Sequence, residues 1–241
     1  MSMPWPLPPV DLRCIRILGK QEAAASRLII MFGADVNFED RADKAGPLVA
    51  AVRAGCDDLV GDLLIAGADP NAHQYGWDGG TPLHAAAERG LASTISVLLS
   101  SPKTDKNALN NDGRSPLTMA SCLGHVAALK TLLAAGADVH IRGASQYLAL
   151  AFGRESAATA MVEHDGSLSV LHWTALMDHA DCAAALVDAG ADTNAKSGRK
   201  DVTPFLLAAR AGSIGALLAL LRRGASVSTK QLTMDLRLYT S

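Results

Sequence analysis

Short apolar runs, most of them closed by glycine, recur along the chain and predict pairs of helices. One kind of run ends in two large aliphatic residues, at Leu63/Leu64, Leu98/Leu99, Leu132/Leu133, Leu186/Val187 and Leu220/Leu221. A second kind, rich in alanine, precedes it, as at residues 85–87 and 208–209. Small residues let neighbouring helices approach closely, while leucines fill the layer beneath them. The pattern therefore favours layered helices over sheets.

One five-residue motif follows the leucine-rich runs at regular intervals. It reads GADVN at Gly33, GADPN at Gly67, GADVH at Gly136, GADTN at Gly190 and GASVS at Gly224. The successive intervals are 34, 69, 54 and 34 residues, so one period is near 34, the second interval is about twice that, and the third is anomalous. A period of this size is typical of a solenoid of stacked repeats.

A second motif, in which Thr, Ser or Gly is followed by proline and then by Leu or Phe, opens the alanine-rich runs. It begins at Gly46, Thr81, Ser115 and Thr203, and three of these residues lie 21 positions before a closing glycine. The stretch TPLHAAAERG, residues 81–90, resembles the TPLHxAAxxGH pattern of the ankyrin-repeat family almost letter for letter. The resemblance covers about residues 12–228. It implies an all-α solenoid of stacked helix-turn-helix repeats with short β-hairpin-like finger loops.

The residue types in these motifs have physical reasons. A Thr or Ser side chain caps a helix start by accepting backbone N–H bonds, and a proline in the next position has no N–H to leave unpaired. Glycine closes a helix because it adopts the left-handed conformation. We expect such caps between the paired helices at Gly55, Gly90, Gly124 and Gly212.

The motifs predict three segments: a proline-rich lead-in over residues 1–11, an ankyrin-repeat domain over 12–228 and a tail over 229–241. Within the domain the predicted repeats are 12–45 (cap-like), 46–80, 81–114, 115–144, 145–168 (degenerate), 169–202 and 203–228. The degenerate repeat is included because the period of about 34 residues does not account for residues 142–166. Two interpretations stay open, an eroded repeat with helices near 145–152 and 155–163, or a helical insertion in one finger. We favour the eroded repeat, because a gap in a solenoid would expose both neighbouring cores.

Residues 169–182 raise a question of chemistry, because two histidines, two aspartates and a cysteine lie within them. Side chains of these types can form a metal site or a nucleophile with its base, and the candidates are His172, Asp178, His179 and Cys182. In register with the repeats, however, His172 and His179 occupy two histidine positions of the family pattern, and the resemblance implies a structural role. Asp178 replaces the usual glycine, so we expect a strained or shifted turn there.

A partner surface is predicted from the resemblance, on the concave face formed by the fingers and the ends of the first helices. The candidate residues are Tyr75, Trp77, Glu88, Arg89, Arg114, Cys122, Leu123, Leu176, Met177, Arg199, Lys200 and Arg210. Trp77, on a glycine-flanked loop, either anchors a partner or packs on the next finger. The four apolar members, at 122, 123, 176 and 177, form either an exposed soft patch or a surface buried by the irregular segment.

Composition narrows the function classes. The formal net charge of −2 and the lack of a Lys/Arg run argue against direct nucleic-acid binding. No apolar segment approaches the ~20 residues of a membrane span, and the N-terminus lacks the pattern of a secretory signal. The four cysteines are widely spaced, which suits reduced thiols in the cytoplasm, with the nucleus as an alternative compartment.

These observations favour a non-catalytic adaptor or scaffold that binds a protein or peptide as a monomer, with no cofactor or metal and no enzymatic activity. Long stacked surfaces without cavities suit protein recognition. Two alternatives remain: a metal-binding or enzymatic protein using His172, Asp178, His179 and Cys182, or the recognition subunit of a larger complex whose activity lies elsewhere.

Overall fold

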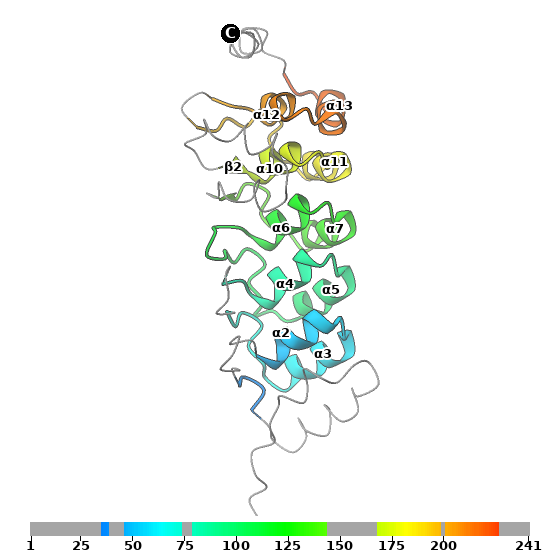
Figure 1. Ribbon diagram of the computed structural model, residues 1–241. Coiled ribbons are helices and arrows are strands. Elements are labelled where there is room, and N and C mark those ends of the chain that lie inside the picture. The colour runs from blue at the N-terminus through cyan, green and yellow to red at the C-terminus, as the bar shows by residue number, and fades with distance from the viewer. Residues whose placement is uncertain (1–34, 39–45, 74–78, 144–167, 199–200, 227–241) are drawn as a thin grey trace, which may run out of the picture. The chain divides into compact units, whose positions relative to one another are not determined.

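The computed structural model describes residues 35–38, 46–73, 79–143, 168–198 and 201–226. Ten α-helices lie in these ranges and follow one another as pairs (Figure 1). The pairs are α2 (Pro47–Ala54) with α3 (Asp57–Ile65), α4 (Pro82–Glu88) with α5 (Ala92–Ser100), α6 (Pro116–Cys122) with α7 (Val126–Ala134), α10 (Val170–Leu176) with α11 (Ala180–Asp188), and α12 (Pro204–Ala211) with α13 (Ile214–Arg222). The all-α fold class is confirmed.

The chain forms two compact bodies, residues 1–105 and 106–241, which we call the N-terminal and C-terminal bodies. In the N-terminal body α2 packs beside α4 and α3 beside α5. In the C-terminal body α10 packs between α6 and α12, and α11 between α7 and α13 (Figure 1). First helices therefore form one layer of each body and second helices the other, as in the solenoid that the motifs predict.

Side chains at the predicted positions cap the first helices. Ser115 and Thr203 each accept a backbone N–H bond three residues on, at 3.2 and 3.3 Å. Thr81 takes part in a capping box with His84. The four glycines expected between paired helices, at 55, 90, 124 and 212, all adopt positive φ between 68° and 74°. Helix boundaries thus follow from local chemistry that is visible in the sequence.

The GADxN motifs join consecutive fingers through their asparagines. In the N-terminal body the Asn71 Oδ1 atom accepts the backbone N–H of Asp105 at 2.8 Å. In the C-terminal body Asn194 does the same for Ser226 at 2.8 Å, and Asn107, which ends the related stretch TDKN (residues 104–107), does so for Asp138 at 2.9 Å. Each bond crosses from one repeat to the next. The asparagine of the motif therefore joins neighbouring fingers through a side-chain hydrogen bond to the backbone.

The repeats that begin at Ser115 and Ser169 are direct neighbours. α6 packs against α10 and α7 against α11, and the short strands β1 (Arg142–Gly143) and β2 (Leu168–Ser169) pair antiparallel. The helices predicted near 145–152 and 155–163 lie outside the described residues. The eroded repeat therefore stays a prediction, although α6 and α7 contact α10 and α11 directly. The insertion interpretation agrees with the packing.

Candidate functional site

His172 connects its own repeat to the next finger. Its Nε2 atom donates to the Val202 carbonyl oxygen at 3.0 Å, and its Nδ1 atom accepts from the Ser169 hydroxyl at 2.7 Å. The side chain is fully buried. Because both ring nitrogens are occupied by these bonds, His172 acts as the structural hydrogen-bonding residue that the resemblance implies.

His179 joins two repeats in a similar way. Its Nε2 atom donates to the Cys122 carbonyl oxygen, 2.9 Å away at the end of α6. The ring lies against Gly124, where a Cβ atom would approach two ring atoms to 2.7 Å. In the following repeat the Ser213 hydroxyl makes the equivalent bond to the Leu176 carbonyl oxygen at 3.1 Å. The residue before a second helix thus repeatedly bonds to the end of the first helix of the preceding repeat.

Asp178 adopts the left-handed conformation of the glycine it replaces, with φ of 62°. The turn is therefore strained, as expected, but it is not shifted. Its Oδ1 atom accepts the backbone N–H of Ala216 at 2.8 Å. Ala216 lies in the first turn of α13, where N–H groups lack intrahelical partners and a carboxylate is favourable. The aspartate that replaces glycine therefore caps the N-terminus of α13, the second helix of the next repeat.

Substitutions at Asp178 should separate the strain from the cap. Asp178→Asn keeps both an acceptor and tolerance of the left-handed region, so we expect stability close to wild type. Asp178→Ala keeps the strain and loses the cap, at a cost of about 0.5–2 kcal/mol. Asp178→Gly loses the cap but relieves the strain, so it should fall between them. Urea unfolding measures the order, which a cost for Asn equal to that for Ala would contradict.

The two cysteines near His179 are in surroundings that suit neither a nucleophile nor a metal. Burial raises the pKa of the Cys122 thiol to about 12. Burial, with the Asp181 carboxylate adding to it, raises the pKa of the Cys182 thiol to about 11. Reactive cysteines have lowered pKa values because the thiolate is the reacting form. Within the part of the chain that the structure describes, no three His, Cys, Asp or Glu side chains are grouped to hold a metal ion.

The predicted soft patch is a core and not a surface. Cys122, Leu176 and Met177 are buried, and Leu123 is half-buried. Cys122 and Leu176 belong to one apolar cluster with Trp173 of α10 and Leu206 and Leu207 of α12. Of the two interpretations left open for these residues, burial agrees with the structure for Cys122, Leu176 and Met177, and it comes from α12 and α6, which pack directly on α10. Trp173 is fully buried in the same cluster.

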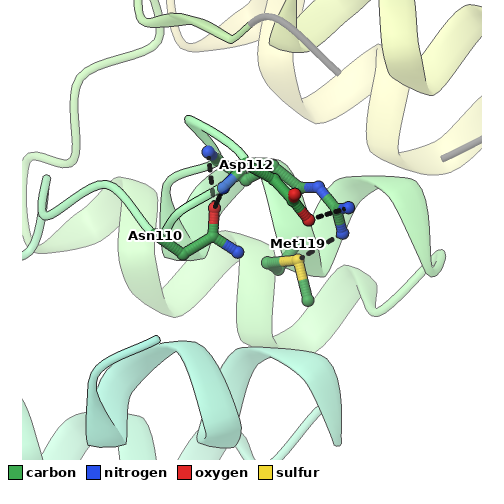
Figure 2. Close-up of polar contacts among 4 residues, drawn as sticks. Asn110, Asp112 and Met119 are labelled. Atoms are coloured by element: carbon green, nitrogen blue, oxygen red, sulfur yellow. Dashed lines mark hydrogen bonds and ion pairs between the residues drawn. The ribbon is translucent and has the colours of Figure 1, made fainter. Parts of the chain in front are cut away.

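Arg114 stabilises its own finger. Its guanidinium pairs with the Asp112 carboxylate and donates to the Met119 sulfur at 3.5 Å (Figure 2). In the same loop the Asn110 Oδ1 atom accepts the backbone N–H groups of Asp112 and Arg114, at 3.1 and 2.8 Å. Only 11% of the Arg114 side chain is exposed. Arg114, which was predicted to contact a partner, therefore stabilises the conformation of its own finger.

Charged side chains of the N-terminal body remain accessible at the ends of the first helices. Arg53 of α2 and Glu88 and Arg89, at the end of α4, are exposed, and the two helices pack side by side. We call these three residues the charged ridge. In the C-terminal body the corresponding Arg210 is half-buried. The other candidates lie outside the described residues: Tyr75, Trp77, Arg199 and Lys200.

Comparisons with known proteins show the same repeat over residues 17–143 and 168–198. A family model described as "Ankyrin repeats (3 copies)" matches residues 17–108 and 48–143, and one described as "Ankyrin repeat" matches 168–198.

Relatives of known name share part of this sequence. Neurogenic locus notch homolog protein 1 of Homo sapiens is 30% identical over 174 residues, 71% of this chain and 6% of that protein. The Xenopus tropicalis protein is 28% identical over 191 residues, 78% of this chain and 7% of its own length. XBAT35 of Arabidopsis thaliana is 36% identical over 92 residues, 38% of this chain and 20% of its own. The chain thus spans a small part of each relative.

Proposed function

Because the chain belongs to the ankyrin-repeat family, we propose that it is a protein–protein interaction module whose charged ridge contacts the partner. Ankyrin repeats are protein–protein interaction modules, and the ends of their first helices supply contact residues. The observation that carries the assignment is exposure: Arg53, Glu88 and Arg89 are accessible, whereas their counterparts Cys122, Leu176 and Met177 are buried.

The chemistry of the ridge suits a peptide or protein surface that carries an acidic group. Two guanidinium groups and one carboxylate lie at the ends of α2 and α4, and arginine pairs with carboxylates through two parallel hydrogen bonds. Arginine is also enriched among the residues that dominate binding energies. We therefore propose that Arg89 receives an acidic side chain of the partner, and that Glu88 excludes partners with a second acidic group beside it.

We also propose that the chain is non-catalytic. His172, Asp178, His179 and Cys182, the residues of the enzymatic alternative, are used in hydrogen bonds between elements or are buried. The ankyrin-repeat family is also generally non-catalytic. None of the described helices is long and apolar enough to pass through a bilayer.

A display experiment with a random peptide library tests the ridge. Peptides selected on the full chain should bind the Arg89→Glu variant about tenfold or more weakly, about 1.4 kcal/mol, because the guanidinium is replaced by a repelling carboxylate. Isothermal titration with one selected peptide measures the change.

Lys103→Glu is the matched control. Lys103 is an exposed cation of the same body that lies outside the ridge, so the same change of charge leaves any long-range electrostatic effect similar. Binding to this variant should stay within about twofold of wild type. Equal losses in both variants, or a loss only in Lys103→Glu, would show that recognition does not depend on the ridge.

A further inference from the structure

The end of α5 departs from the pattern that closes the other described second helices. After α3, α7, α11 and α13 an alanine follows the closing glycine, and its backbone N–H donates to the first large residue of the aliphatic pair at 2.9–3.0 Å. These alanines are Ala68, Ala137, Ala191 and Ala225. After α5 the corresponding positions hold Pro102 and Lys103, and the Thr104 hydroxyl donates to the Leu98 carbonyl oxygen at 2.6 Å. A side chain therefore closes α5 where the backbone closes the other helices.

The turn after α5 is also one residue longer than its equivalents. Asp105 donates its backbone N–H to the asparagine of the preceding finger, as Asp69, Asp138 and Ser226 do in their repeats. Asp105 is six positions beyond Leu99, whereas Asp69 is five positions beyond Leu64 and Asp138 five beyond Leu133. The extra residue and the proline thus both lie in residues 101–104. Departures from a rule that the rest of a molecule obeys are expected at functional sites.

Four serine or threonine residues of the chain are followed directly by proline, and three of them begin helices. Thr81, Ser115 and Thr203 precede α4, α6 and α12. Thr81 and Ser115 are buried and Thr203 is half-buried. Their side chains take part in the N-terminal caps described above. A group could be attached to one of these hydroxyls only if the first turn of its helix opened.

Ser101 is the fourth, and its surroundings differ from those of the other three. It lies at the end of α5 and not at a helix start, so no N-terminal cap depends on its hydroxyl. Its side chain is partly exposed, and Pro102 and Lys103 after it are exposed. Its backbone is extended, with φ of −80° and ψ of 122°, the conformation that a following proline favours.

The hydrogen bonds that hold this turn are few and lie at the surface. The Thr104 backbone N–H donates to the Ser101 carbonyl oxygen at 3.1 Å, and the Asn71 Nδ2 atom donates to the Lys103 carbonyl oxygen at 2.7 Å. Surface turns open locally at a lower free energy than packed helices do. An enzyme that needs an extended serine–proline segment therefore meets less resistance here than at any of the three caps.

We propose that Ser101 is a phosphorylation site for a proline-directed protein kinase, the class of kinase that acts on serine or threonine followed by proline. In the transfer the Ser101 Oγ atom attacks the γ-phosphorus of ATP, and the bond from this phosphorus to the β–γ bridging oxygen breaks. ADP leaves, and a carboxylate of the kinase takes the hydroxyl proton. The product carries a charge of about −1.5 to −2 at the carbonyl end of α5, outside the charged ridge.

Incubation of the folded full chain with ATP and a purified cyclin-dependent kinase tests the site, and mass spectrometry locates the phosphate. Ser101 should be modified about tenfold or more faster than the three capping residues, because their hydroxyls become accessible only when a helix start opens. Ser101→Ala should remove most of the incorporated phosphate. Ser100→Ala is the matched control at the neighbouring exposed serine and should leave the incorporation unchanged. Pro102→Ala should slow the reaction, since the kinase class requires the proline.

A synthetic peptide of residues 97–106 serves as the reference substrate without a fold. Three outcomes would overturn the proposal. A peptide that is not phosphorylated would show that the sequence is no substrate, and a phosphorylated peptide with an unmodified chain would show that the folded turn does not admit the kinase. Equal modification of Ser101 and the three capping residues would show that the kinase acts on unfolded chains. Because none of these outcomes measures peptide binding, the charged ridge is judged by its own experiment.

Discussion

Replacing Leu176 with glutamate is expected to unfold the C-terminal body. Leu176 is fully buried in the cluster that joins α10 to α12. Truncating a buried leucine costs about 2–5 kcal/mol, and an unpaired carboxylate in the same place adds several kcal/mol more. Since a domain has only about 5–15 kcal/mol of stability, the variant should lose most of its cooperative urea unfolding transition, measured by circular dichroism.

Leu109→Glu is the control for this expectation. Leu109 belongs to the same body but is 48% exposed, so the same substitution should change the free energy of unfolding by about 0.5 kcal/mol or less. A Leu176→Glu protein as stable as the Leu109→Glu protein would mean that residue 176 faces solvent. In that case the soft patch would return as a candidate binding surface.

The second large effect is expected from Gly124→Ala, because two penalties coincide there. Gly124 has φ of 74°, a conformation that costs a residue with a Cβ atom about 1–2 kcal/mol. The new Cβ atom would also lie 2.7 Å from the His179 ring. The ring must then move and lose its bond to the Cys122 carbonyl oxygen, which is about 0.5–1.5 kcal/mol more. Urea unfolding should show a loss of about 2–3 kcal/mol.

Gly212→Ala isolates the contact with the ring. Gly212 has a similar φ of 69°, but a Cβ atom there meets nothing within 4 Å, so only the backbone penalty applies. A double-mutant cycle adds a second check: in a His179→Ala background Gly124→Ala should cost no more than Gly212→Ala. Equal costs of the two glycine substitutions in the wild-type background would show that the ring does not depend on Gly124.

Repeat boundaries and helix caps were predictable because their causes are local. Thr81, Ser115 and Thr203 accept bonds from residues three positions away, and the inter-helix glycines need only their own backbone conformation. The same locality explains why the structural roles of His172 and His179 could be inferred from register alone. Their partners were not predictable, since Val202 and Cys122 lie 30 and 57 residues away.

Burial at the first-helix ends was not predictable, because it depends on which helices are neighbours. The extra residues 142–166 suggested that a repeat stood between the Ser115 and Ser169 repeats, which would have separated Cys122 from Leu176. Direct packing of α6 on α10 instead places both in one cluster. Asp178 was recognised as a departure from the usual glycine. Its capping role was not predictable, because the backbone N–H that it accepts belongs to Ala216, 38 residues further along the chain. The predicted contacts of Tyr75, Trp77, Arg199 and Lys200 stay predictions.

Two variants separate recognition from architecture most directly. Arg89→Glu removes an exposed cation of the charged ridge, and His179→Ala removes a bond between repeats from the cluster that first suggested chemistry. The measurement is the Kd of one library-selected peptide for each folded variant. We expect Arg89→Glu to weaken binding about tenfold or more and His179→Ala to leave it within about twofold. The reverse pattern, with binding lost in His179→Ala and retained in Arg89→Glu, would contradict the assignment of recognition to the ridge.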